Sequence, residues 1–190
     1  MRMEIPAPRT GDTTPPGVEY RIRKFQERIG DLPELLTPEE VLARYNAGPD
    51  TGIFTDGSCD PNPGQGGWGL VWVEKGQIRE ERSGHDPRTT NNRMELQALI
   101  EAYKLLPDQG HYSVYSDSQL AVNTITQWAA GWEKRGWKRK SGPIKNLELV
   151  RELWALSLAK PEIELKWIKA RDGSVWNEYA DALASSYMRR

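Results

Sequence analysis

Four acidic residues stand in surroundings where an idle charge would be costly. Asp56 follows the run Ile-Phe-Thr and Asp117 follows Val-Tyr-Ser, so both are expected where short strands end. Glu95 stands in Met-Glu-Leu and Asp181 in Ala-Asp-Ala, on segments whose apolar residues follow helical spacing. Open α/β sheets form their ligand crevices beside strand ends, so these side chains are candidates for one shared site.

Carboxylates that converge repel one another, and this repulsion indicates the chemistry. Two of them about 4 Å apart repel by roughly 4 kcal/mol at an effective dielectric near 20. A cluster of four therefore needs protons or a cation, and hard oxygen ligands favour Mg²⁺, with Mn²⁺ as a substitute. Two such ions about 4 Å apart can activate a water and stabilise the leaving oxygen in phosphodiester hydrolysis.

Each of these acids also has a plainer explanation when it is taken alone. Asp56 followed by glycine is typical of a turn, and Asp117 followed by serine is typical of a helix N-cap. Glu95 and Asp181 singly are typical of charges on exposed helix faces. The metal hypothesis therefore depends on the whole set.

The first 50 residues differ from the rest in composition. Residues 1–17 are rich in Pro, Thr and Gly without periodicity, which predicts a flexible tail. Apolar positions over 18–29 follow helical spacing, and Thr37-Pro38-Glu39-Glu40 predicts the capped start of a second helix. We expect residues 18–50 to form a small helical appendage of unknown role, followed by a domain over residues 51–190.

The order of elements in that domain predicts its fold. We expect strands over residues 53–56, 66–74, 77–83, 113–116 and 163–167. Helices are expected over residues 94–105, 120–130, 144–158 and 175–187. The order βββαβααβα predicts an α/β fold with a mixed five-stranded sheet, three strands antiparallel and two parallel, flanked by helices.

Composition limits the classes of partner. Lys and Arg number 26 against 27 Asp and Glu, so nucleic-acid binding would need a local basic patch. The single cysteine, Cys59, excludes an internal disulfide and a four-cysteine zinc site. No apolar run reaches membrane-spanning length. We expect a cytoplasmic, soluble protein that works as a monomer and has no membrane partner.

Four motifs resemble those of ribonuclease H type 1. They are Phe-Thr-Asp-Gly-Ser-Cys around Asp56, Thr-Thr-Asn-Asn-Arg-Met-Glu-Leu around Glu95, Tyr-Ser-Asp-Ser-Gln around Asp117, and Asn-Glu-Tyr-Ala-Asp-Ala-Leu-Ala around Asp181. They occur in the order and spacing of that family over about residues 52–188. The resemblance implies a ribonuclease H-like fold and an endonuclease that cuts the RNA strand of RNA–DNA hybrids. It also implies 5′-phosphate and 3′-hydroxyl ends and two Mg²⁺ ions held by the four carboxylates.

One position departs from the family pattern. The family usually carries a histidine in a Gly-His-Ala-Gly loop before the last helix, and Arg171 occupies the matching position here. Arginine cannot exchange a proton near neutral pH, but it can offer charge and a fork of donors to a phosphate. The resemblance makes Arg171 a candidate catalytic residue, and an exposed loop arginine without a role is the alternative.

A basic segment over residues 131–145 resembles the protrusion of many ribonucleases H. Its cations would neutralise phosphates, and Lys138, Arg139 and Lys140 are the candidate ligands. Trp128 resembles the aromatic residue that packs on deoxyriboses, while Trp132 and Trp137 are expected in the core of the protrusion. A solvated charged turn is the alternative.

The resemblance also assigns polar residues to each strand of a hybrid. An enzyme tells RNA from DNA by its 2′-hydroxyl, and the expected readers are Cys59, Asn62, Asn91 and Gln119. A phosphate of the DNA strand would be held by Arg88, Thr90 and Asn146. For Asn62 and Asn91 a turn or cap role stays an equal alternative.

Three other functions compete with this interpretation. A module that binds hybrids without cutting them would lack a metal carboxylate, and all four are present. A proofreading-type exonuclease would carry Asp-x-Glu where this chain has Asp56-Gly57-Ser58. A nuclease domain of a reverse transcriptase fits less well with an initiating methionine and an N-terminal appendage. That appendage lacks the aromatic and glycine pattern of the hybrid-binding domain found in some relatives.

Overall fold

The structure of the protein is a computed structural model in which residues 34–189 are described. The tail expected over residues 1–17 and the helix expected over 18–29 lie outside the described residues. Leu35–Arg190 forms one compact unit. Among the helices of residues 34–189, none has both the length and the hydrophobicity needed to cross a bilayer.

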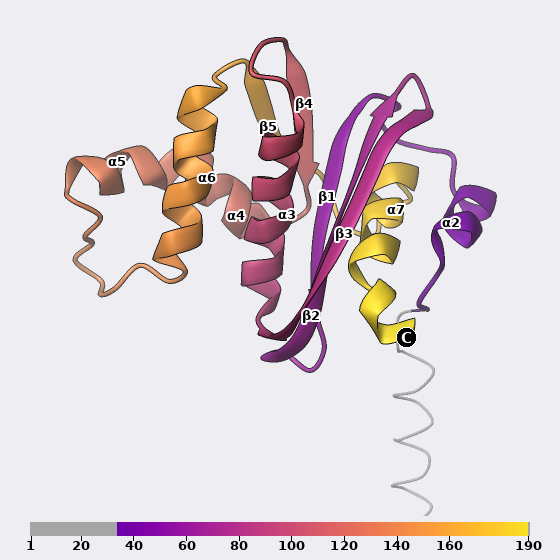
Figure 1. The fold of residues 1–190 in the computed structure, drawn as a ribbon, viewed down its shortest axis with the longest axis horizontal. Coiled ribbons are helices and arrows are strands. Elements are labelled where there is room, and N and C mark those ends of the chain that lie inside the picture. Colours follow the sequence, from indigo (N-terminus) through magenta and orange to yellow (C-terminus); the bar gives the residue numbers. More distant parts are fainter. Residues whose placement is uncertain (1–33, 190) are drawn as a thin grey trace, which may run out of the picture. The chain divides into compact units, whose positions relative to one another are not determined.

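A mixed five-stranded sheet with the order β3-β2-β1-β4-β5 forms the centre of this unit (Figure 1). Its first three strands are antiparallel, and β4 pairs in parallel with both β1 and β5. The predicted α/β architecture is confirmed. The strands are β1 (Gly52–Cys59), β2 (Gly64–Glu74), β3 (Gln77–Thr89), β4 (Tyr112–Ser116) and β5 (Ile163–Trp167).

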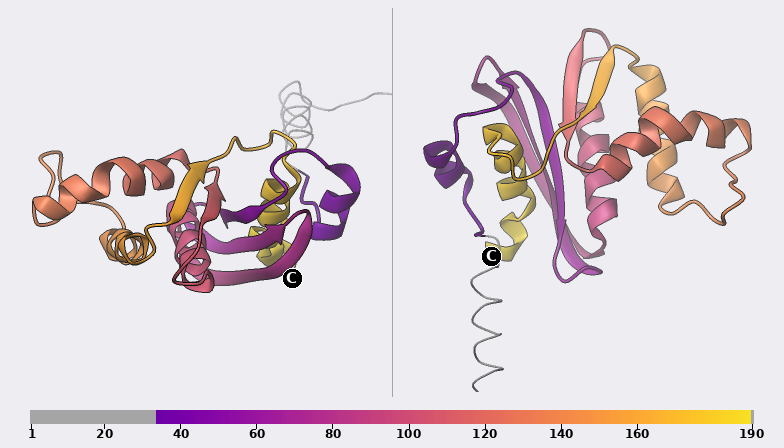
Figure 2. Two further views of the ribbon diagram at one scale, coloured as in Figure 1. Left: turned by 90° about the horizontal axis from the view of Figure 1, so that it is seen from above. Right: turned by 180° about the vertical axis from the view of Figure 1, so that it is seen from behind.

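Helices cover both faces of the sheet (Figure 1, Figure 2). They are α2 (Pro38–Arg44), α3 (Asn91–Leu105), α4 (Gln119–Asn123), the π-helix η1 (Thr124–Trp128), α5 (Ala129–Lys134), α6 (Leu147–Ala159), α7 (Val175–Ala184) and the 3₁₀-helix η2 (Ser186–Arg189). Neighbouring residues of β1 serve opposite faces, because side chains alternate along a strand. Ile53 packs in the cluster that contains α3 and α6, and Phe54 packs in the cluster that contains α2 and α7.

The helix expected over residues 120–130 is present and runs over 119–134, but it contains a π-helical turn. It divides into α4, η1 and α5, and the π-turn ends at Trp128. The hydroxyls of Thr124 and Thr126 donate to the carbonyls of Leu120 and Val122, 2.7 and 2.8 Å away. Such back-bonding loosens the regular ladder and bends helices, and π-turns of this kind often occur at functional sites.

Several boundaries also differ from those expected. β3 continues to Thr89 rather than residue 83, and α7 ends at Ala184 before a 3₁₀ turn. α6 begins at Leu147 rather than at residue 144. α3 begins at Asn91, because the Thr90 hydroxyl accepts from a main-chain N–H in its first turn. Glu95 therefore lies one turn into this helix rather than at its start.

The segment around α2 is part of the compact unit. Thr37 and Glu40 form the predicted capping box, and Val41 is buried with residues of β1, β2 and α7. The main-chain N–H of Val175 donates to the carbonyl of Ala47, 2.9 Å away. The compact unit begins at Leu35 and so includes α2, and Leu36 and Tyr45 pack against the same cluster as Val41.

Candidate active site

The sheet brings two of the four acids together directly. Thr55 of β1 and Ser116 of β4 are partners in the parallel register, so the residues that follow them, Asp56 and Asp117, are neighbours. Asp56 lies within β1, and Gly57 continues the strand, so the turn expected as the alternative does not form here. Glycine follows Asp56 for another reason, which is that helix α3 lies very close to the strand at residue 57.

Gly57 allows α3 to deliver the third acid. A Cβ atom at residue 57 would lie 2.3 Å from the main-chain nitrogen of Glu95 and 2.5 Å from the carbonyl carbon of Met94. No side chain fits in that space, so glycine lets the helix backbone lie against the strand. The carboxylate of Glu95 is thereby buried beside Asp56, and both side chains are almost inaccessible.

These side chains form one pocket. Carboxylate oxygens of Asp56, Glu95 and Asp117 all lie within 4.8 Å of one another. Asp181 of α7 lines the same hollow and is more exposed. The geometry therefore brings together all four acids that the sequence singled out.

Burial and mutual repulsion dominate the electrostatics of the carboxylates in the pocket. Burial, followed by repulsion from Glu95, Asp117 and Asp181, raises the pKa of Asp56 well above its usual range. Burial, followed by the charge of Asp117, raises the pKa of Glu95 in the same way. The Oε2 atom of Glu95 is buried, and no group of residues 34–189 hydrogen-bonds to it. This donor set fits a divalent cation, which would neutralise the repulsion and satisfy the orphaned oxygen.

Arg171 lines the carboxylate pocket from the loop before α7. Its backbone is left-handed, with φ of 53°. Burial raises the pKa values of Asp117 and Glu178, and the positive charge of Arg171 offsets part of that rise. An ion pair between Lys169 and Asp172, with N and O 3.2 Å apart, braces the loop. Arg171 therefore lies at the carboxylate pocket, close enough for its charge to act on Asp117 and Glu178.

A second hollow, of about 130 Å³, lies next to the carboxylate pocket. Asn91 and Asp117 line the carboxylate pocket, and the residues that follow them, Asn92 and Ser118, line the second hollow. We name the second hollow the basic-aromatic groove, because cations and tryptophans contribute to its lining. Those residues are Trp128, Trp132, Arg139 and Lys145, and Asn146 lies beside them.

The comparisons with known proteins agree with this geometry. The ribonuclease H family model matches residues 49–189. The chain belongs to the ribonuclease H family. It is 46% identical over 134 residues to a ribonuclease H of Herminiimonas arsenicoxydans, covering 70% of this chain and 90% of that relative. A ribonuclease H of Erythrobacter litoralis is 44% identical over 134 residues, covering 70% and 92%.

Solved structures of ribonucleases H share the fold. LC9-RNase H1, described as a type 1 RNase H with the type 2 active-site motif, is 31% identical, with a TM-score of 0.59 and 74% of each chain covered. The N-terminal RNase H domain of rv2228c from Mycobacterium tuberculosis is 26% identical, with a TM-score of 0.55, covering 73% of this chain and 94% of that one. The resemblance noted in the four motifs is confirmed.

In this ribonuclease H, the turn between β1 and β2 carries residues expected to read RNA. Cys59 lies with its Sγ 3.5 Å from the carbonyl oxygen of Thr89, and the Oδ1 of Asn62 accepts from the main-chain N–H of Asn91 at 3.2 Å. The turn is therefore tied to the start of α3, and the cap alternative holds for that oxygen of Asn62. Asn91 lines the carboxylate pocket. Gln119 is exposed at the start of α4.

The expected cations of the protrusion differ in their surroundings. Lys138 and Lys140 are exposed and line neither hollow. Arg139 lines the basic-aromatic groove, and its guanidinium donates to the carbonyls of Gly142 and Pro143, 3.1 and 2.8 Å away. It therefore shapes the protrusion loop as well as charging the groove.

The tryptophans of this segment differ in exposure. Trp128 is 39% exposed, and its ring lies 6.0 Å from that of Trp132. Trp132 and Trp137 pack against the core, and the guanidinium of Arg151 lies 5.5 Å from the Trp137 ring. Arg88 is exposed and lines neither hollow. Of the two tryptophans that line the basic-aromatic groove, Trp128 is the one whose side chain is exposed.

Two residues of α7 in the pocket were missed from the sequence. Glu178 lines it one turn before Asp181, and burial, followed by the charges of Asp181 and Asp117, raises its pKa. Asn177 is buried, and its Nδ2 donates to an Oδ2 of Asp117 at 3.2 Å. The i, i+3 spacing of Glu178 and Asp181 would have placed both on one helix face. Nothing in the sequence alone pointed to the bond made by Asn177.

Proposed function

We propose that this chain is an endonuclease that hydrolyses the RNA strand of RNA–DNA hybrids and leaves 5′-phosphate and 3′-hydroxyl ends. The observation that carries this proposal is the pair of adjoining hollows. The carboxylate pocket offers the hydrolytic chemistry, and the basic-aromatic groove beside it offers a surface for a second strand. Together the two hollows would let the protein cut one strand of a duplex while it holds the other.

Four carboxylates would hold the metal, which we propose to be two Mg²⁺ ions, with Mn²⁺ as a substitute. These are Asp56, Glu95, Asp117 and Asp181. When bound, such ions supply a nucleophilic hydroxide near neutral pH and stabilise charge on a leaving oxygen. Because burial and mutual repulsion raise the pKa values of Asp56 and Glu95, metal binding at a pH below those values would release protons.

The other residues of the pocket orient and neutralise. The amide of Asn177 donates to Asp117 and so holds that carboxylate in one orientation. The indole N–H of Trp167 donates to the main-chain carbonyl of Asp117, 3.1 Å away, which holds the end of β4. Arg171 presents a permanent charge to the phosphate that is being cut, and it offers donors to the developing negative charge.

Discrimination between the strands would occur on either side of the start of α3. On the RNA side, Cys59, Asn62, Asn91 and Gln119 are the proposed readers of 2′-hydroxyls, some through main-chain atoms. On the DNA side, the Trp128 ring would pack on deoxyriboses in the groove, with Lys138, Arg139 and Lys140 neutralising phosphates. Arg88, Thr90 and Asn146 would hold one DNA phosphate away from the cut. LC11-RNase H1, which shares the fold, was solved in complex with an RNA/DNA hybrid.

Incubation of the protein with a labelled RNA–DNA hybrid tests the activity. Cleavage of the RNA strand is expected with Mg²⁺ and not with EDTA, while single-stranded RNA, duplex RNA and duplex DNA stay intact. Asp56→Asn is expected to abolish cleavage. The matched control Asp108→Asn, which removes an exposed carboxylate beyond the end of α3, is expected to cleave normally.

A non-cleaving module that binds hybrids is the alternative function. Such a module would bind the labelled hybrid with any divalent metal and leave both strands intact. That outcome would refute the proposed nuclease activity. A cytoplasmic localisation and a monomeric state stay predictions.

A further inference from the structure

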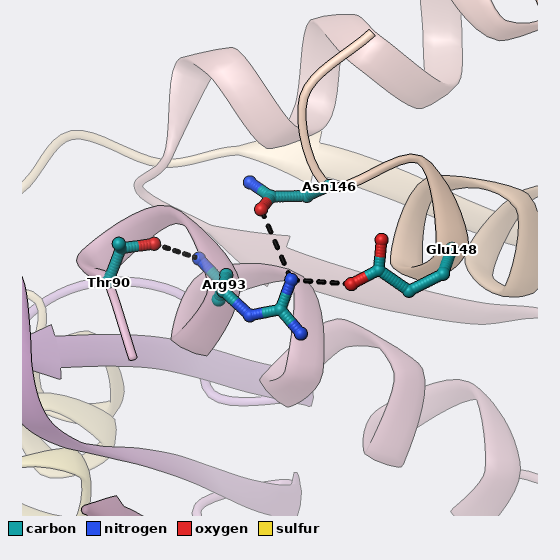
Figure 3. Close-up of polar contacts among 4 residues, drawn as sticks. All are labelled: Thr90, Arg93, Asn146 and Glu148. Carbon is teal, nitrogen blue, oxygen red and sulfur yellow. Dashed lines mark hydrogen bonds and ion pairs between the residues drawn. The ribbon is translucent and has the colours of Figure 1, made fainter. Parts of the chain in front are cut away.

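Arg93 joins the start of α3 to the start of α6 (Figure 3). Its main-chain N–H donates to the hydroxyl oxygen of Thr90 at 3.3 Å. Its Nη1 donates to the Oδ1 of Asn146 at 3.3 Å and forms an ion pair with Glu148. One arginine therefore touches two of the three residues proposed to hold a DNA phosphate, and it is itself held by a carboxylate.

The backbone of Asn146 explains why its side chain faces this arginine. Asn146 stands at the N-cap of α6 in the left-handed conformation, with φ of 54° and ψ of 36°, and its side chain makes no capping bond. Asparagine accepts this conformation more readily than most residues. The amide oxygen accepts from Arg93 of α3 instead of capping its own helix.

The chemistry of the guanidinium determines which end of that amide points outward. Arginine has only donors, so the amide oxygen of Asn146 must face it and the NH₂ group must face away. Figure 3 shows the amide nitrogen pointing away from Arg93. Within residues 34–189, no group accepts a hydrogen bond from that nitrogen, and Asn146 borders the basic-aromatic groove.

Thr90, like Asn146, has a hydrogen-bond donor that is not used within the site. Its oxygen accepts from the main-chain N–H of Arg93, so its own hydroxyl hydrogen remains available to donate. Glu148 largely neutralises the charge of Arg93, and the bond to Arg93 lowers the pKa of Glu148. The site therefore offers two uncharged donors, the Thr90 hydroxyl and the Asn146 amide, and both residues contact an arginine that is paired with Glu148.

We infer that Arg93 is a positioning residue for a DNA-strand phosphate: it orients the Asn146 amide as a donor, and Glu148 holds it in place. This inference rests on the proposed function, because it assumes that a hybrid occupies the groove. Arg93 acts through Asn146 and does not itself need to touch the phosphate.

Steady-state kinetics on a hybrid with single methylphosphonate substitutions along its DNA strand test the inference. For the unaltered protein, a methylphosphonate at one particular position of the DNA strand is expected to raise KM about tenfold, as the loss of one charge-assisted hydrogen bond would. Arg93→Met is expected to raise KM about tenfold on the unmodified hybrid, with kcat within about twofold of the parent. A methylphosphonate at that same position should then cause no further rise in KM. Asn146→Ala should match it, and the double variant should be no worse than either single one.

Two further variants separate positioning from mere stability. Lys104→Met breaks the other ion pair between α3 and α6, with Glu152 at 2.9 Å, and is expected to leave KM and the methylphosphonate profile unchanged. Arg93→Gln keeps a polar side chain, but it can accept as well as donate and so no longer forces the amide outward; it should behave as Arg93→Met does.

The outcomes are distinguishable. If the unaltered protein does not cut the hybrid, the proposed function fails. If it cuts and is sensitive at one DNA phosphate, but both Arg93 variants keep that sensitivity and an unchanged KM, the inference alone is overturned. Equal losses in Arg93→Met and Lys104→Met would also overturn it, because they would indicate general destabilisation.

Discussion

Replacing Asp56 by asparagine is expected to stabilise the metal-free protein while it abolishes cleavage. Asparagine has nearly the shape of aspartate but no charge, so the variant removes repulsion and leaves the packing of β1 intact. Oxygens of Asp56, Glu95 and Asp117 lie at most 4.8 Å apart. Two unit charges at 4.8 Å repel by about 3.5 kcal/mol at an effective dielectric of 20.

The size of the effect depends on pH in a defined direction. The pKa values of Asp56 and Glu95 are raised in the folded state, so the fold binds more protons than the unfolded chain. Its stability therefore falls as pH rises from about 4, the usual carboxyl range, through the raised values. The advantage of Asp56→Asn should be small near pH 4 and largest at neutral pH.

Thermal unfolding in EDTA measures this advantage. We expect a gain of about 3 kcal/mol at neutral pH, which corresponds to a rise of about 6–12 °C in Tm for a chain of this size. Added Mg²⁺ should narrow the gap, because only the unaltered pocket gains the full binding energy. Asp108→Asn, the exposed control, should change Tm little. A variant less stable than the parent in EDTA at pH 7, or a gap independent of pH, would refute the clustering argument.

Three other substitutions have defined outcomes. Arg171→Ala should lower kcat about tenfold or more at saturating metal and hybrid; an unchanged rate would remove its catalytic role. Replacing Lys138 and Lys140 together by alanine, with Arg139 kept to hold its loop, should reduce the slope of log Kd against log salt by about 1.8 for two lost phosphate contacts. If the variant and the parent have the same slope of log Kd against log salt, those lysines do not contact phosphates. Tyr187→Phe removes the hydroxyl that accepts from the β1–β2 turn at 2.9 Å and should cost about 1 kcal/mol in urea unfolding; no loss would show that this bond is dispensable.

The sequence predicted the carboxylates because their local signals are strong. Asp56 and Asp117 follow apolar runs that fold as β1 and β4, and the four motifs stand in family order. The convergence of the acids depends on long-range facts that no local window contains. These are the register of Thr55 with Ser116 and the close approach of α3 at Gly57.

The failures of prediction have physical reasons as well. β3 is the edge strand and most of its residues are exposed, so hydrogen bonds to β2, rather than an apolar pattern, extend it to Thr89. The π-helical turn Thr124–Trp128 coincides with hydroxyl back-bonds of Thr124 and Thr126, which residue spacing does not reveal. The contact between Arg93 and Asn146 joins residues far apart in the chain and requires a left-handed asparagine.

Calorimetric titration of the protein with Mg²⁺ tests the central claim, that distant acids form one metal-holding pocket, most directly. At mildly acidic pH we predict saturable binding accompanied by proton release, seen as a heat that varies with the ionisation enthalpy of the buffer. Glu95→Gln and Asp117→Asn should each weaken the binding, and Asp108→Asn should not. Absence of saturable binding, or binding unaffected by Glu95→Gln, would contradict the account.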